Sequence, residues 1–128
     1  MEAEGVGYGG GMIVDDASSP TLTGVTFSNN SAARYGGGMN LWYSSPTLTG
    51  VTFSGNTANN KGGGIYLSIS SINGSYVLIN NNYAEGHGAG IFISAGSNIN
   101  LNKSTIASNM VGPGDTFGAG IYADGGTA

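Results

Sequence analysis

Apolar residues alternate with small or polar residues along short stretches of this chain, and the alternation returns at regular intervals. One set of alternating pairs follows glycine-rich segments: Met12 and Val14, Met39 and Leu41, Ile65 and Leu67, Ile91 and Ile93. A second set lies further along each interval: Val25 and Phe27, Val51 and Phe53, Val77 and Ile79. A period of two residues is typical of a β-strand with one buried face. The pattern therefore predicts two or three short strands per interval, with no space for a helix of about ten residues.

The glycine-rich segments define the length of the repeat. Five of them align, and their first glycines are residues 9, 36, 62, 88 and 118, so the successive spacings are 27, 26, 26 and 30 residues. A second block repeats in step, because residues 18–30 return at 44–56 with one change, from Asn29 to Gly55. A constant period between 20 and 50 residues indicates stacked structural repeats. Short strands in such a repeat predict a parallel β-solenoid.

We therefore predict an all-β, right-handed parallel β-helix of about four and a half coils, each of roughly 26 residues. Residues 1–7 are expected to be a lead-in or an artificial extension, and residues 8–128 a single domain that is a segment of a longer solenoid. Coils stacked ~4.8 Å apart would place equivalent residues in ladders. The predicted ladders beyond the glycine-rich segments are Val25, Val51 and Val77; Phe27, Phe53, Ile79 and Ile106; and Asn30, Asn56, Asn82 and Asn109. The asparagine ladder would be hydrogen-bonded, because an amide carries both donor and acceptor.

Composition narrows the class of protein. Glycine accounts for 25 of 128 residues, while 7 acidic and 3 basic residues make only 10 charged positions. This excludes a helical bundle, because glycine costs about 1 kcal/mol per helical site relative to alanine. The formal net charge of -4 argues against binding to nucleic acid, and no apolar stretch is long enough to insert into a membrane. The chain contains no cysteine, and we expect no cofactor and no metal.

Two motifs recur together in the repeats. One is Gly-Gly-Gly-Met/Ile or Gly-Ala-Gly-Ile, and the other is Phe-x-x-Asn, as in residues 27–30 and 53–56. They resemble the repeats of chlamydial polymorphic outer membrane proteins and related bacterial surface β-helix proteins. The resemblance covers residues 8–123, although Ile79 and Ile106 replace the phenylalanine of the second motif. It implies a right-handed β-helix of the autotransporter passenger type, secreted or exposed at the cell surface, with a structural or adhesive role.

A set of outward-facing aromatic residues is the leading candidate for a binding site. Strand alternation places Tyr66, Phe92 and Tyr122 on the outer face of three consecutive coils, and Trp42 and Tyr43 lie nearby. Exposed rings can stack on sugars or cover a partner surface. Like side chains in adjacent coils also stabilise one another without any ligand. From these five residues we predict a glycan or host-surface ligand, with purely structural stacking as the alternative.

A second outward surface is polar. Thr21-Leu-Thr23 returns as Thr47-Leu-Thr49 in the next coil. Regular Thr-x-Thr arrays resemble the flat faces of β-solenoid ice-binding proteins, so ice binding is an alternative function for this chain. Threonine is also a favourable residue for any exposed strand.

Catalysis is not expected. Asp15 and Asp16 are adjacent, and on a strand their side chains would face opposite ways, so they would not form an acid/base pair. His87 shares a ladder with Tyr35, Lys61 and Phe117, and we interpret it as a surface position. We predict no catalytic residue, with a fragment of a polysaccharide-active β-helix enzyme as the alternative.

The repeats run to both ends of the sequence without a polar cap. Uncapped coils leave strand edges unpaired, which favours end-to-end stacking. A subunit that assembles head to tail into a fibre is therefore a further alternative.

Overall fold

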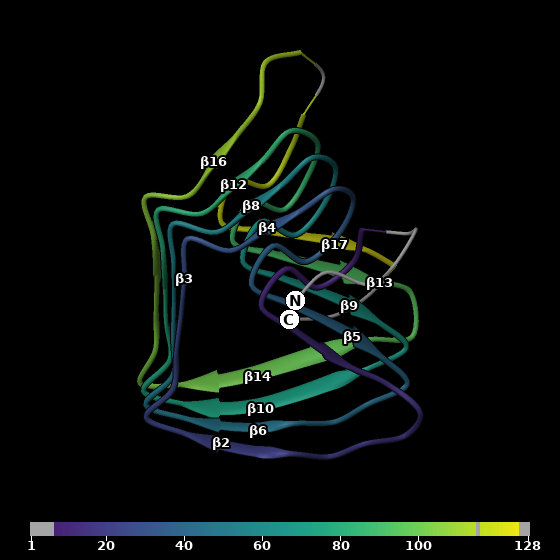
Figure 1. The fold of residues 1–128 in the computed structure, drawn as a ribbon, viewed down its shortest axis with the longest axis vertical. Coiled ribbons are helices and arrows are strands. Elements are labelled where there is room, and N and C mark those ends of the chain that lie inside the picture. Colours follow the sequence, from purple (N-terminus) through teal and green to yellow (C-terminus); the bar gives the residue numbers. More distant parts are fainter. Residues whose placement is uncertain (1–6, 115, 126–128) are drawn as a thin grey trace.

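The computed structural model describes residues 7–114 and 116–125, which form a stack of parallel coils (Figure 1). These residues contain seventeen strands and no helix. Four consecutive sets of four strands make four coils, and one further strand begins a fifth. The predicted all-β parallel solenoid with a repeat of about 26 residues is confirmed.

Equivalent strands of successive coils pair in parallel and form four sheets. The five-stranded sheet contains β1 (Met12–Val14), β5 (Met39–Trp42), β9 (Ile65–Ser68), β13 (Ile91–Ser94) and β17 (Ile121–Asp124). The second sheet contains β2 (Thr21–Thr23), β6 (Thr47–Thr49), β10 (Ser71–Ser75) and β14 (Asn98–Asn102). The third contains β3 (Thr26–Ser28), β7 (Thr52–Ser54), β11 (Leu78–Asn80) and β15 (Thr105–Ala107). The fourth contains β4 (Ser31–Ala32), β8 (Thr57–Ala58), β12 (Tyr83–Ala84) and β16 (Met110–Val111).

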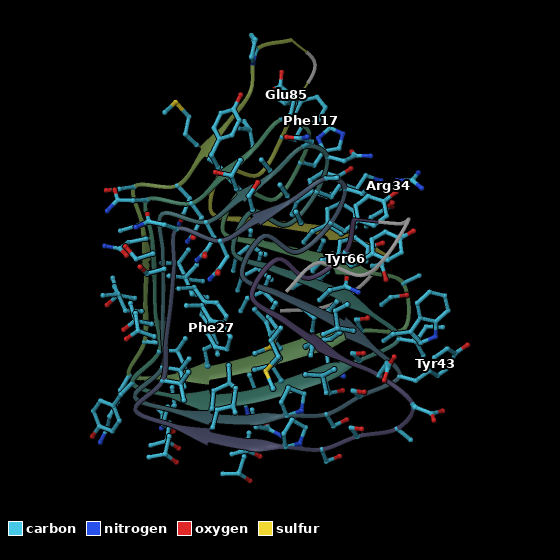
Figure 2. All side chains as sticks on the ribbon, viewed as in Figure 1. Phe27, Arg34, Tyr43, Tyr66, Glu85 and Phe117 are labelled. Carbon is cyan, nitrogen blue, oxygen red and sulfur yellow. The ribbon has the colours of Figure 1, made fainter. Side chains whose placement is uncertain are left out.

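The apolar ladders lie inside the coil, as predicted. Phe27 pairs with Phe53, Phe53 with Ile79, and Ile79 with Ile106 in the third sheet. The Phe27 and Phe53 rings stack with centroids 4.8 Å apart, and Figure 2 shows Phe27 pointing into the interior. The valine ladder lies at the corner that precedes these strands. Its carbonyls accept hydrogen bonds from backbone N–H groups of the next coil: Val25 from Thr52, Val51 from Leu78, and Val77 from Thr105.

The asparagine ladder is present with the hydrogen bonds expected of it. The Nδ2 of Asn30 donates to Oδ1 of Asn56, that of Asn56 to Asn82, and that of Asn82 to Asn109, over 3.0–3.1 Å. Each acceptor Oδ1 also receives the backbone N–H of the asparagine in the coil before it. The ladder therefore joins all four coils at one corner.

Each coil has four strands, one more than the largest number predicted. The strand that the pattern does not reveal follows the asparagine and is two residues long. Its inward residue is a fully buried alanine in the first three coils (Ala32, Ala58 and Ala84) and the partly buried Val111 in the fourth. A strand this short shows no alternation, and alanine gives a weak apolar signal. Gly24 separates β2 from β3, because it turns the chain with a φ of 64°.

Candidate functional site

The outer face of the five-stranded sheet carries one continuous stack of aromatic rings. Tyr8 stacks on Tyr35 with ring centroids 5.2 Å apart, and Tyr35 stacks on Tyr66 at 4.6 Å. Tyr66 then stacks on Phe92 at 5.2 Å, and Phe92 on Tyr122 at 5.3 Å. The stack therefore joins the predicted ladder of Tyr66, Phe92 and Tyr122 to two tyrosines that precede the glycine-rich segments.

Within this stack the predicted exposure of Phe92 is wrong. Its side chain is only 2% exposed, because the Tyr66 and Tyr122 rings lie on either side and Lys61 places its Nζ 4.8 Å from the ring centroid. Tyr66 is partly buried. Burial raises the pKa of the Tyr66 phenol above its ordinary value, with smaller contributions from the nearby tyrosines and Asp124. The middle of the ladder stabilises the stack and offers little ring surface to a ligand.

His87 continues the aromatic stack towards the last coil. Its ring lies 4.8 Å from Tyr122 and 5.6 Å from Phe117, and its Nδ1 accepts a hydrogen bond from the Phe117 N–H at 3.0 Å. The predicted ladder before the glycine-rich segments is present. Tyr35 bridges to Lys61, and the carbonyls of His87 and Phe117 accept hydrogen bonds from the N–H groups of Gly62 and Gly88 in the preceding coils. His87 is partly buried and has a structural role in this ladder.

Trp42, the last residue of β5, and Tyr43, which follows it, both carry exposed rings. They are 50% and 51% exposed, and their centroids lie 6.0 Å apart at an angle of 35°. Figure 2 shows Tyr43 pointing away from the coil. The two rings border an open groove of about 660 Å³ on the first two coils, which we call the Trp42 groove. It is lined by Tyr8, Ile13, Asp15, Asp16, Ala17, Asn40, Trp42 and Tyr43.

Asp15 and Asp16 both line this groove, and they lie beyond the strand on which their side chains were predicted to face opposite ways. The strand ends at Val14, so the alternation of a strand does not apply to them. Asp16 has a φ of 58° and Ala17 a φ of 63°, and Ser18 N–H donates to the Asp15 carbonyl over 3.2 Å. The resulting turn brings two consecutive acidic residues to the lining of one groove. The alternation pattern of the sequence does not reveal this turn.

Asn40 is the site residue that sequence reasoning missed. It stands on β5, paired with Ile13 on one side and Tyr66 on the other, and its side chain is only 5% exposed. Within the described part of the chain, its buried Oδ1 has no hydrogen-bond partner. Asn40 lines both the Trp42 groove and a smaller hollow of about 50 Å³ beside Tyr8, Tyr35 and Trp42. That volume is sufficient for a water molecule or one hydroxyl group.

The threonine face lies where the sequence placed it. Thr21 pairs with Thr47 and Thr23 with Thr49, and all four side chains are exposed. In the next two coils the same positions hold Asn73 and Ser75, then Asn100 and Asn102. The threonine array therefore covers two coils and continues as a mixed amide and hydroxyl surface.

Neither a cluster of metal-ligating residues nor a membrane-spanning helix occurs among the described residues. No group of three or more His, Cys, Asp or Glu residues stands close enough there to hold a metal ion. Nor do residues 7–114 and 116–125 contain a helix with the length and apolarity to cross a membrane.

The stacked parallel coils define the class of protein as a parallel β-solenoid. The chain belongs to the right-handed β-helix family, because the model of the right-handed β-helix region matches residues 4–128. Comparison with curated proteins found no match, and comparison with solved structures found none either. The family includes both polysaccharide-active enzymes and proteins that are not enzymes, so membership alone assigns neither role.

Proposed function

We propose that this β-helix repeat domain binds carbohydrate through the Trp42 groove and has no catalytic role. The observation that carries the proposal is the pairing of two exposed aromatic rings, Trp42 and Tyr43, with the polar groups of Asp15, Asp16 and Asn40 in one open groove. The other large rings of the same sheet are stacked on one another. This moves the proposed binding site from the middle of the aromatic ladder to the corner of the first two coils.

The groove has the two kinds of group that a sugar needs. A sugar ring presents C–H groups on its faces, which pack against the flat faces of tryptophan and tyrosine. Its hydroxyls donate hydrogen bonds, and carboxylate oxygens are strong acceptors for them. A groove of about 660 Å³ that is open to solvent has space for sugar residues.

The proposed setting is extracellular, either secreted or at the cell surface. The likeness of the Gly-rich and Phe-x-x-Asn motifs to chlamydial surface repeats supports this placement. In this setting the domain acts as a structural and adhesive element that attaches its parent surface to a polysaccharide.

The tryptophan itself provides the test. Trp42 is the single tryptophan of the chain, so its fluorescence reports directly on the groove. Titration with a panel of oligosaccharides is expected to change this fluorescence in a saturable way for at least one of them. Calorimetry is then expected to show that Trp42→Ala weakens binding at least tenfold, about 1.4 kcal/mol, because the stacking surface is lost.

Tyr76→Ala is the matched control for this experiment. Tyr76 is also exposed, at 59%, but it lies after β10 and does not line the groove. Its substitution is expected to leave binding unchanged. A panel in which no oligosaccharide alters Trp42 fluorescence would refute carbohydrate binding. Release of shortened sugar products, lost in Asp15→Asn or Asp16→Asn, would instead show an enzyme.

A further inference from the structure

We propose that the Trp42 groove selects oligosaccharides that carry positively charged amino groups, such as chains of β-linked glucosamine. This inference rests on the proposed carbohydrate binding and specifies its ligand class. It is carried by three independent features: the sign of the charge in the groove, the aromatic rings beside that charge, and the hydrogen-bonding character of the polar groups.

The charge in the groove is negative. Asp15 and Asp16 contribute two carboxylates, and no Lys or Arg is among the described residues that line it. The basic side chains lie against other rings: Arg34 at 5.6 Å from Tyr35, Lys61 at 4.8 Å from Phe92, and Lys103 at 5.5 Å from Tyr76. The groove therefore favours a cationic ligand over an acidic sugar.

The rings of the groove favour the same ligand. An ammonium group is attracted to the face of an aromatic ring, most strongly that of tryptophan. The three cation–ring contacts just described show the same chemistry within the fold, each between a basic side chain and an aromatic one. At Trp42 and Tyr43 the rings are half exposed, and the groove beside them is wide enough to admit a ligand.

The polar residues of the groove also favour a ligand that is rich in hydrogen-bond donors. The carboxylates of Asp15 and Asp16 accept hydrogen bonds and, when ionised, cannot donate them. The buried Oδ1 of Asn40, a residue that also lines the groove, is a further acceptor without a partner among the described residues. An ammonium group supplies three N–H donors, whereas an N-acetyl group supplies one donor and adds an acceptor.

The experiment compares two oligosaccharides that differ in these amino groups. Trp42 fluorescence is titrated with the β-1,4-linked glucosamine hexamer and with its fully N-acetylated counterpart, at a pH where the free amines are protonated. The glucosamine hexamer is expected to bind about tenfold more tightly. Raising the salt concentration from 0.02 M to 0.5 M is expected to reduce that advantage to less than about threefold, because the groove is open to solvent.

A double variant isolates the role of the carboxylates. Asp15→Asn with Asp16→Asn removes both charges and keeps the shape, and asparagine tolerates the positive φ at residue 16. It is expected to bind the two hexamers with nearly equal affinity, while its thermal unfolding stays close to that of the parent chain. Glu85→Gln is the control for a change in net charge, because Glu85 is exposed and does not line the groove. It is expected to keep the preference for the amine.

The outcomes separate this inference from the proposed function. Equal or tighter binding of the N-acetylated hexamer would overturn the amine preference and leave carbohydrate binding intact. Absence of a response to every oligosaccharide would overturn both. A hexamer of lysine that binds as tightly as the glucosamine hexamer would show that charge alone is recognised, and the assignment to an amino sugar would fail.

Discussion

A single asparagine position shows how each coil is held to the next. Asn56 is fully buried, and its Oδ1 accepts two hydrogen bonds from Asn30, from the backbone N–H at 3.0 Å and from Nδ2 at 3.1 Å. Its Nδ2 donates to the carbonyl of Phe27 at 2.9 Å and to Oδ1 of Asn82 at 3.0 Å. One side chain thereby satisfies the polar groups of a tight corner in two neighbouring coils.

Replacing this side chain tests its contribution. Asn56→Ala would leave the N–H and the Nδ2 of Asn30 without a partner and would remove one bond to the carbonyl of Phe27, and a buried group left unpaired costs about 1–3 kcal/mol. We expect the free energy of unfolding in urea to fall by about 2–4 kcal/mol. Asn59→Ala is the control, because Asn59 is exposed in the same coil, and its effect should stay within about 0.5 kcal/mol. Equal losses in the two variants would contradict the assigned role of the ladder.

The corners that lead into and out of the strands depend on glycine for two different reasons. At Gly24, between β2 and β3, the backbone has a φ of 64°, and an added Cβ would have no atom within 4 Å. At Gly63, before β9, a Cβ would meet the backbone oxygen of Tyr83 and would lie 2.6 Å from the oxygen of Ala89. Conformation alone requires the first glycine, whereas the close approach of backbone in the next coil requires the second.

These two reasons predict different costs for the same substitution. Gly24→Ala should destabilise the fold by about 1–2 kcal/mol, the cost of a left-handed backbone conformation in an L-residue. Gly63→Ala should cost more than about 3 kcal/mol, because the backbone cannot yield as a flexible side chain could. Chemical denaturation of both variants measures the difference. A cost at Gly63 no larger than that at Gly24 would show that the coils separate easily.

In the molecule as a whole, the hydrophobic core is a column of equivalent side chains that stack from one coil to the next. Ile79 lies in the third coil, between Phe53 and Ile106, and is fully buried. Ile106 lies in the fourth coil, at the edge of the third sheet, and is only partly buried. In a stack of this kind each coil contacts only its neighbours, so stability is the sum of coil and interface contributions.

Replacing isoleucine by alanine in the third coil and in the fourth coil tests this description. Ile79→Ala removes contacts with coils on both sides and should cost about 3–5 kcal/mol. Ile106→Ala removes contacts mainly with one coil and should cost about 1–2 kcal/mol. Urea denaturation followed by circular dichroism provides both values. If the two costs were equal, the coils would be coupled over longer distances than their direct contacts.

The position of the Trp42 groove could not be predicted from the sequence repeat. Register placed Tyr66, Phe92 and Tyr122 correctly in one row, but the exposure of a ring depends on side chains from other rows, such as Lys61 over Phe92. Likewise, Asp15 and Asp16 share a surface because the chain turns after Val14, where the first coil departs from the alternation of its strands. Asn40 gave no signal in the sequence, since an asparagine on a strand is ordinarily solvated.

The amino-acid sequence by itself determined the repeat, the parallel solenoid and the identity of the ladders. It did so because each coil packs on a near copy of itself, so a periodic sequence gives periodic contacts. Only the tertiary structure decided which outward side chains are covered and which meet in a groove. Those properties depend on rows that lie far apart in the sequence, and on the turn at which Ala17 leaves the repeating pattern.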